Sequence, residues 1–283
     1  MNTAVVQQRA WDGRAAANFM AGGAGSGLVV ATACGAALAG TPRWPFVLAA
    51  ALVAVGLVSV WAEIGRPWRA LNVLLHARSS WMTREALLAP ALLLLALAAA
   101  LLPAAAAVAA PLAALAALVA LAFVYCQGRM LRAARGIPTW REPAIVPLIV
   151  ATALVEGAAL WLIVISRPVG ALAWLVFGAL LLARQGLWMR WRARLHTAAS
   201  ALRAVDDAGR LLRLGSLGAL AVVVVLLLAP LPPIAAAPLQ LAAALAALAG
   251  GLWFKFTLIT RAAFTQGFTI PHRPVRGVRP QER

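Results

Sequence analysis

Residues 61–85 read WAEIGRPWRALNVLLHARSSWMTRE, and long apolar runs lie on both sides of them. The stretch contains two carboxylates, Glu63 and Glu85, together with four arginines, one histidine and three tryptophans. We interpret it as a loop between two membrane helices, with its edges in the bilayer interface. Glu63 is expected to close the helix before the loop, and Glu85 to open the helix after it.

The composition predicts a membrane protein. The chain has 283 residues, of which 64% are hydrophobic and 12% are charged, whereas a soluble domain averages about 45–50% apolar and about 25% charged residues. Apolar runs of about 18 residues or more recur along the chain, and each is long enough to cross a bilayer. Arg9, Asp12 and Arg14 precede the first long apolar run, so no cleavable signal peptide is predicted.

The order of apolar runs predicts an all-α integral membrane protein with eight transmembrane helices. The chain then divides into an N-terminal segment (1–17), a membrane domain (18–261) and a basic tail (262–283). The longest hydrophilic segment, 184–213, is basic and rich in Ala and Leu, so helical extensions are expected there rather than an open loop. The predicted spans are 18–40, 44–61, 85–102, 106–125, 144–165, 171–183, 214–228 and 234–259.

The charge pattern predicts the orientation. The formal net charge is +17, and the basic residues lie in short segments between apolar runs. Because this placement is typical of membrane topology signals, nucleic acid is excluded as a partner. With eight spans, 23 of the 25 basic residues fall on one face, which leaves Arg43 and Arg167 for the other. The positive-inside rule therefore predicts cytoplasmic N- and C-termini, and a partner is expected to dock on the cytoplasmic face.

Glu63 and Glu85 are the first candidates for chemistry. Burial near lipid favours the protonated form of a carboxylate, which suits such a group to exchange protons with a lipid-soluble redox carrier. The alternative is that each acid simply pairs with an arginine. These pairs would be Glu63 with Arg66, and Glu85 with Arg84 or Arg69.

Glu156 lies inside the fifth predicted span, with no charged residue within ten positions on either side. An ionisable group at such depth is costly and usually faces the bundle interior or a water path. One interpretation is a proton relay or a polar contact between helices; the other is a neutral carboxyl group hydrogen-bonded to a neighbouring helix. Lys255 and Arg261 are expected to extend their charged groups to the inner interface.

Other residue patterns favour packing over chemistry. The glycines at 22, 23, 25 and 27 suggest a phosphate loop, but no strand precedes them, so close helix packing is expected instead. His76 is a candidate proton shuttle. His196 and His272 are interpreted as loop residues, and since no histidine lies inside a predicted span, no haem is predicted. No metal site and no catalytic residue are assigned.

Several motifs resemble the membrane-anchor subunits of the dimethyl sulfoxide reductase family. EIGRPWRALNVL and then SWMTRE are similar to a Leu-Gly-x-Pro-x-Arg-Ala stretch and a Ser-x-x-x-Glu element of those anchors. Further similar stretches are NFMAGGAGSGL, FVYCQGRML with IPTWREP, and FKFTLITRAAFTQGF. The resemblance covers most of the chain and includes the eight-helix plan. The tail PHRPVRG is similar to anchors of sulfite-oxidising and phenylacetyl-CoA-oxidising relatives.

The resemblance implies a haem-free subunit that anchors an iron–sulfur subunit and a molybdopterin subunit. Such a subunit binds no cofactor of its own and exchanges electrons with membrane quinone, its exchangeable substrate. In the family, a histidine tied to quinol binding often precedes Leu-Gly-x-Pro, whereas this chain has Glu63 there. The acid of the family's Ser-x-x-x-Glu element maps onto Glu85.

The sequence thus predicts a quinone-reactive anchor in the bacterial inner membrane. Quinone binding and proton transfer are assigned to Glu63, Arg66, His76 and Glu85, and a proton relay to Glu156. Docking of the ferredoxin-like iron–sulfur subunit and the molybdopterin subunit is assigned to Arg69, Arg78, Arg129 and Trp140. The alternative functions are a purely structural membrane anchor and a transporter or channel for small solutes or ions.

Overall fold

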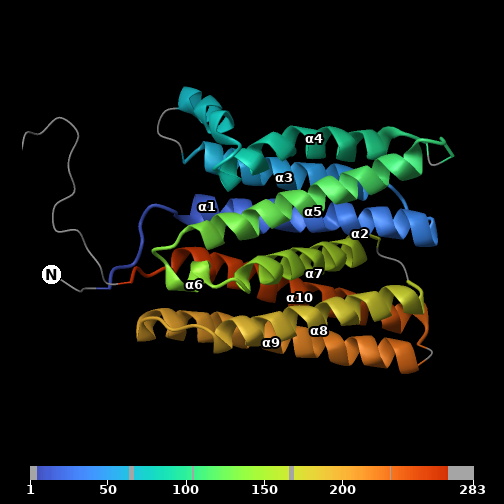
Figure 1. The fold of residues 1–283 in the computed structure, drawn as a ribbon. Helices are drawn as coiled ribbons and strands as arrows, with labels where there is room; N and C mark the ends of the chain where they lie inside the picture. Colours follow the sequence, from blue (N-terminus) through green and yellow to red (C-terminus); the bar gives the residue numbers. More distant parts are fainter. Residues whose placement is uncertain (1–4, 64–66, 104, 166–168, 230, 267–283) are drawn as a thin grey trace, which may run out of the picture.

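The computed structural model describes residues 5–63, 67–103, 105–165, 169–229 and 231–266. Within these ranges the chain is helical and forms no β-strand, apart from one isolated bridge between Gln7 and Phe264. The long helices pack side by side along a common direction (Figure 1). The predicted all-α fold is therefore confirmed for this part of the chain.

Seven helices of the described chain are long and apolar enough to cross a membrane. They are the continuous run Gly13–Ala39 (α1, Gly13–Ala17; the π-helix η1, Asn18–Gly22; and α2, Gly23–Ala39), α4 (Trp81–Leu101), α5 (Ala109–Ala133), α7 (Ile145–Ile165), α8 (Ala171–Ala193), α9 (Ala199–Leu228) and α10 (Pro233–Thr260). The apolar helix α3 (Pro45–Trp61) has 17 residues. These lengths support a multi-pass membrane protein, while the count of eight spans and the cytoplasmic termini stay predictions.

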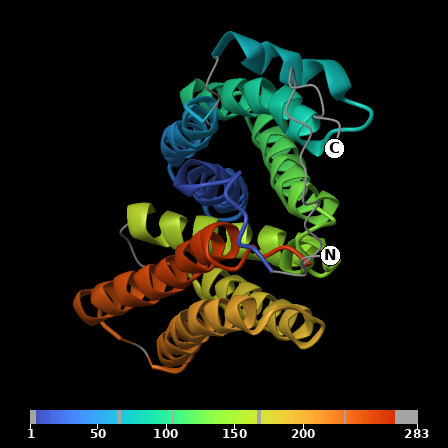
Figure 2. The same cartoon turned by 90° about the vertical axis from the view of Figure 1, so that its left-hand side faces the viewer.

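The connections between the long helices lie at two opposite ends of the bundle (Figure 1). One end holds the 3-10 helix η2 (Pro67–His76) and the short helix α6 (Pro138–Arg141), and we call it the η2 end. The other end holds the C-terminal ends of α2, α4, α7 and α9, and we call it the turn end. Figure 2 views the molecule from the η2 end and shows η2 lying across the edge of the bundle.

Local sequence explains where several helices begin and end. Gly40 ends α2 in the left-handed region, with φ at 55°, a conformation that glycine adopts without steric cost. Pro45 is the first residue of α3, where a missing N–H costs nothing. The Ser80 side chain caps α4 by accepting a hydrogen bond from the Thr83 N–H at 3.2 Å.

The hydrophilic segment 184–213 forms helical extensions, as predicted. Helix α8 continues to Ala193 and α9 already begins at Ala199. The 30 residues of α9 span about 45 Å, at about 1.5 Å per residue, which exceeds the bilayer's hydrocarbon core of about 30 Å. Arg192 joins the two extensions by donating to both Asp206 carboxylate oxygens, at 2.5 and 2.8 Å.

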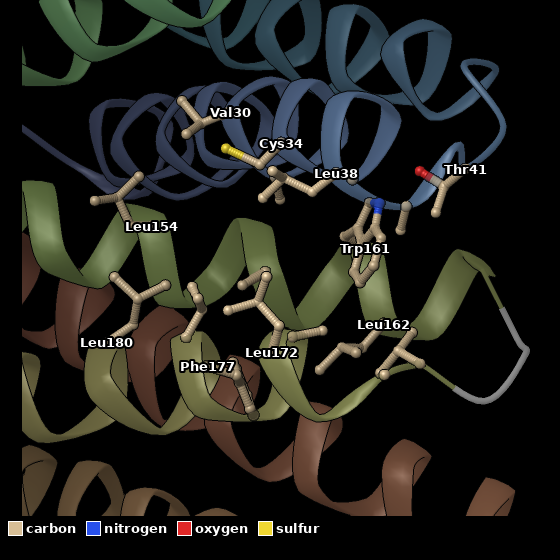
Figure 3. Close-up of a pocket in the computed structure, with 18 of the residues that line it drawn as sticks. Val30, Cys34, Leu38, Thr41, Leu154, Trp161, Leu162, Leu172, Phe177 and Leu180 are labelled. Atoms are coloured by element: carbon tan, nitrogen blue, oxygen red, sulfur yellow. The ribbon is translucent and has the colours of Figure 1, made fainter.

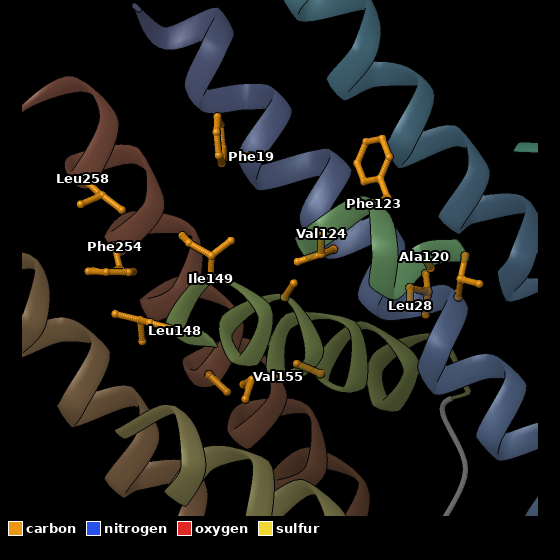
Figure 4. Packing of buried hydrophobic residues seen from close by; sticks show 14 of the residues in the cluster. Phe19, Leu28, Ala120, Phe123, Val124, Leu148, Ile149, Val155, Phe254 and Leu258 are labelled. Carbon is orange, nitrogen blue, oxygen red and sulfur yellow. The ribbon is translucent and has the colours of Figure 1, made fainter. Parts of the chain in front are cut away.

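Helix α7 is central to the packing, because it contacts α2, α5, α8 and α10. Its apolar side chains interlock with those of α5 and α10 (Figure 4). The closest approach joins α7 to α2: a Cβ added to Gly157 would lie 1.9 Å from the Gly27 carbonyl carbon. The glycine run before residue 28 therefore serves close helix packing, as the sequence predicts.

We expect Gly157→Val to destabilise the bundle, because its side chain would force α7 away from α2. Overpacking of a tight contact costs about 1–3 kcal/mol, occasionally more, and thermal unfolding in mild detergent measures this loss. Gly218→Val is the matched control, since a Cβ at Gly218 in α9 meets nothing within 4 Å. Equal melting temperatures for the two variants would contradict the α2–α7 contact.

Candidate functional site

Glu85 lies in the second turn of α4 and is buried, with 5% of its surface exposed. Its Oε1 accepts hydrogen bonds from Asn18 Nδ2 at 3.2 Å and from Gln127 Nε2 at 3.1 Å. The Gln127 amide also donates to the Asn18 backbone carbonyl at 3.2 Å. Three elements, η1, α4 and α5, therefore converge on one carboxylate, and both groups that bind it are neutral amides.

The π-helix η1 positions Asn18 for this contact. Short π-helical turns inside α-helices occur frequently at functional sites. Two glycines leave room for the amide: a Cβ on Gly22 would lie 3.2 Å from Asn18 Oδ1, and a Cβ on Gly56 would lie 3.0 Å from the same atom. Asn18 Oδ1 and Gln127 Oε1 are buried and accept no hydrogen bond within the described chain. The site is thus a buried acid with two further acceptors beside it.

The predicted ion pair between Glu85 and Arg84 does not form. The Arg84 guanidinium instead donates to the backbone carbonyls of Ala77 at 2.9 Å and Arg78 at 2.8 Å. It also stacks on the Trp81 ring, 4.0 Å from the ring centroid. Helical geometry explains this outcome, because neighbouring residues of one helix point to different faces. For the alternative partner, Arg69, the described structure covers the backbone but not the side chain.

An aromatic and basic cluster lies on α4 and α5 beside Glu85. Arg129 packs over the Trp81 ring at 4.3 Å, on which Arg84 also lies, and donates to the Tyr125 hydroxyl at 2.7 Å. Trp81 and Tyr125 meet edge to face, with 5.8 Å between ring centroids. A flat aromatic ring with two cations on it therefore lies about one helical turn before Glu85 on α4, toward the η2 end.

Glu63 follows the last turn of α3 and lies apart from the amide pair at Glu85. Its neighbours are in the N-terminal segment, where Arg14 donates to the Ala62 carbonyl at 2.9 Å. Burial raises the pKa of Glu63, the nearby Asp12 carboxylate raises it further, and Arg14 opposes both. The predicted partner Arg66 lies outside the described residues.

A second buried centre joins α7, α8, α9 and α10. Glu156 Oε2 accepts from Lys255 Nζ at 2.5 Å, and both side chains are fully buried. Arg184 is also fully buried and donates to the Ala247 carbonyl at 3.0 Å and to Ser216 Oγ at 2.8 Å. Glycine at 251 allows the groups to meet, because a Cβ there would lie 2.7 Å from Glu156 Oε1 and 3.2 Å from Arg184 Nη1.

Two expectations from the sequence are therefore wrong. Lys255 does not extend to the interface, because Glu156 holds it inside the bundle. Arg184 belongs to this buried centre rather than to a hydrophilic segment. Glu156 is part of an ion pair, which fits the predicted polar contact between helices. The one signal in the sequence was that Lys255, the chain's single lysine, sits within an apolar run.

The two centres come close to each other at Gly23. A Cβ on Gly23 would lie 2.5 Å from Lys255 Nζ and 3.3 Å from Gln127 Oε1. A set of buried polar side chains thus crosses the bundle, with Gly23 between Gln127 and Lys255, and we call it the polar row. Its members are Glu85, Asn18, Gln127, Lys255, Glu156, Arg184 and Ser216.

The other predicted site residues have separate positions. His76 ends η2 and is exposed, as is Arg78, and neither contacts Glu85. Trp140 is buried, stacks on Trp11 with 5.0 Å between ring centroids and donates to the Leu258 carbonyl at 2.9 Å. Its assignment to partner docking is therefore corrected: Trp140 attaches α6 to the N-terminal segment and to α10. Arg129 is half-buried, and its docking role stays a prediction.

No three His, Cys, Asp or Glu side chains of the described ranges come together as a metal site would require. A scan against models of protein families matches no family, and a search of curated proteins finds no match. Any functional proposal therefore depends on the polar row and on the motifs of the sequence.

We expect Lys255→Met to lower the free energy of unfolding by about 3–5 kcal/mol, because it leaves the Glu156 carboxylate buried without its cation. The double variant Glu156→Gln/Lys255→Met should recover part of that loss, since it removes both charges. Chemical or thermal unfolding in detergent measures both. A double variant as unstable as the sum of the two single variants would show that the charges are not coupled.

We expect Asp12→Asn to lower the pKa of Glu63, because it removes a negative charge that raises this pKa and leaves Arg14 unopposed. Asparagine retains the ability to cap α1, so the N-terminal segment should stay in place. Arg14→Gln is the opposite control and should raise the pKa of Glu63. NMR titration of carboxyl-labelled glutamate checks both signs, and two shifts in the same direction would contradict this electrostatic arrangement.

Proposed function

We propose that this chain is the membrane anchor and quinone-reactive subunit of a molybdopterin and iron–sulfur oxidoreductase. It would pass electrons between the iron–sulfur subunit and the quinone pool of a bacterial inner membrane. The resemblance of its motifs to the anchors of the dimethyl sulfoxide reductase family suggests this class. The observation that carries the proposal is the buried Glu85, held by the amides of Asn18 and Gln127.

Quinone chemistry requires a proton donor and acceptor inside an apolar site, because reduction of a quinone to a quinol takes up two electrons and two protons. Glu85 Oε1 receives both amide hydrogen bonds. Its Oε2 accepts none from the described chain, so Oε2 is the atom we assign to proton exchange with a quinone oxygen. The two amides would hold the carboxylate in place during this exchange.

The η2 end supplies the features that a quinone and a partner would contact. Trp81 offers a flat wall beside Glu85, and the guanidinium groups of Arg84 and Arg129 lie on it. The positive-inside rule assigns this basic end to the cytoplasm, where the iron–sulfur and molybdopterin subunits would dock. Arg78 is exposed there and remains a docking residue in this proposal, as does Arg129.

Glu63 and His76 have secondary roles in the proposal. Both belong to the segment between α3 and α4, and His76 is exposed at the end of η2. Protons released or taken up at Glu85 must reach water at the η2 end. The raised pKa of Glu63 suits it to exchange protons closer to neutral pH than an ordinary glutamate.

We expect Glu85→Gln to reduce quinone-linked turnover by about 10²–10⁴-fold, the usual contribution of a general acid or base. The complex should still assemble, because glutamine can keep a hydrogen bond to the neighbouring amides. When a water-soluble dye replaces quinone as the electron carrier, the molybdopterin subunit in variant membranes should be as active as in parent membranes. Glu142→Gln is the matched control, since Glu142 lies at the same end but faces Arg194, at 3.7 Å, outside the polar row.

Equal quinone-linked turnover in Glu85→Gln and parent membranes would exclude this role and leave a purely structural anchor. The membrane complex isolated in mild detergent provides the second measurement. Molybdenum and iron, two co-purifying subunits and no haem absorbance support the anchor. An isolated chain without metals would favour a transporter, for which the buried Glu156–Lys255 pair is the supporting observation.

A further inference from the structure

An elongated pocket of about 550 Å³ lies between α2, α7 and α8. Its volume is within the range of about 300–1,000 Å³ that is usual for ligand sites. Figure 3 shows its side chains on these three helices. The pocket reaches Thr41 and Gly170, which follow the ends of α2 and α7 at the turn end, whereas η2 lies at the opposite end of the bundle (Figure 1). It is therefore distinct from the proposed quinone site.

The length of the pocket matches one leaflet of a bilayer. On α2, its wall runs from Gly27 to Ala39 and continues to Thr41. The helical part of this wall covers about 18 Å at about 1.5 Å per residue, whereas half of the hydrocarbon core measures about 15 Å. A volume of about 550 Å³ spread over this length forms a narrow slot. Small side chains in its wall, such as those of Ala31 and Ala158, leave this space open.

The slot opens toward lipid. Three residues of its wall are strongly exposed on the outside of the bundle: Leu38 at 70%, Leu172 at 58% and Val176 at 49%. In a membrane-spanning chain such surfaces contact acyl chains. No Asp, Glu, Lys or Arg is among the described residues that line the slot, so these residues would not compensate an ionic solute for its lost hydration. A ligand must therefore be apolar and enter from the bilayer.

Two buried polar atoms lie near the turn end of the slot. Trp161 and Thr41 line it and are 6% and 5% exposed. Trp161 Nε1 and Thr41 Oγ1 have no hydrogen-bond partner within the described chain. Glycine at 35 lets them approach, because a Cβ there would lie 2.5 Å from Trp161 Cζ2 and 2.8 Å from Thr41 Oγ1. Figure 3 shows the indole nitrogen on the side facing Thr41.

We propose that this slot binds one acyl chain of a membrane phospholipid. The ester carbonyl oxygen would accept hydrogen bonds from the Trp161 indole N–H and the Thr41 hydroxyl. The depth fits, because the donors lie near the connection between α2 and α3, where Trp44 is 49% exposed and where aromatic residues typically mark the membrane interface. The apolar chain would then extend along α2 for the depth of one leaflet.

The test is the lipid that remains bound to the full-length chain after purification in mild detergent and extensive washing. Lipid extraction with mass spectrometry gives the phospholipid and quinone retained per chain. We expect about one phospholipid per parent chain. Ala31→Trp fills the slot and should lower this retention about tenfold or more. Trp161→Phe should lower it about fivefold, the effect of losing one ordinary hydrogen bond on an affinity.

Ala51→Trp is the matched control, because it adds the same side chain at an exposed position of α3 outside the slot. It should retain phospholipid like the parent. The proposal is overturned if Ala31→Trp retains as much phospholipid as the parent, or if Ala51→Trp loses as much phospholipid as Ala31→Trp. It is also overturned if the molecule that Ala31→Trp displaces is quinone. If Ala31→Trp does not purify as a folded protein, Trp161→Phe, which keeps an aromatic ring in place, decides the same question.

Discussion

The ion pair between Glu156 and Lys255 is the constraint on which the arrangement of the helices depends. An unpaired charge inside a membrane bundle is so costly that each partner must face the other. Their contact, at 2.5 Å between Oε2 and Nζ, fixes the rotation of α7 against α10. Arg184 adds α8 and α9 to the same centre through Ser216. Since α7 also meets α2 at Gly27 and Gly157, the pair sets the position of the second half of the chain relative to the first.

The polar row divides the molecule into regions with different chemistry. In the described chain, the buried ionisable side chains other than cysteine are Glu85, Glu156, Arg184 and Lys255, and all four belong to the row. The described residues that line the slot near the turn end carry no charge and only isolated polar atoms. A ligand that needs proton exchange would thus use the η2 end, whereas a ligand held by apolar contact would use the slot. Two unlike ligands could occupy one bundle without competing.

Much of the fold was predictable, because long apolar runs and their Pro and Gly boundaries depend on local sequence. The helical extension of α9 and the close packing at Gly27 were also expected from composition. The site was harder to predict from the sequence. Glu85 stood out beside an unusual loop, but Asn18 and Gln127 lie far from it in sequence and carry common side chains. Lys255, Arg184 and Trp140 were assigned to the surface by general rules for basic and aromatic residues, which do not include the long-range packing that buries them.

The contact at Gly23 connects the two halves of the polar row electrostatically. The Gln127 amide donates through Nε2 to Glu85, so its Oε1 points away from Glu85 and toward Gly23, where the Lys255 ammonium also lies. A positive charge on that side favours this orientation of the amide dipole and strengthens the hydrogen bond that its N–H makes to Glu85. Glu156 offsets the charge of Lys255, and a change at Glu156 would therefore alter the field at Gln127.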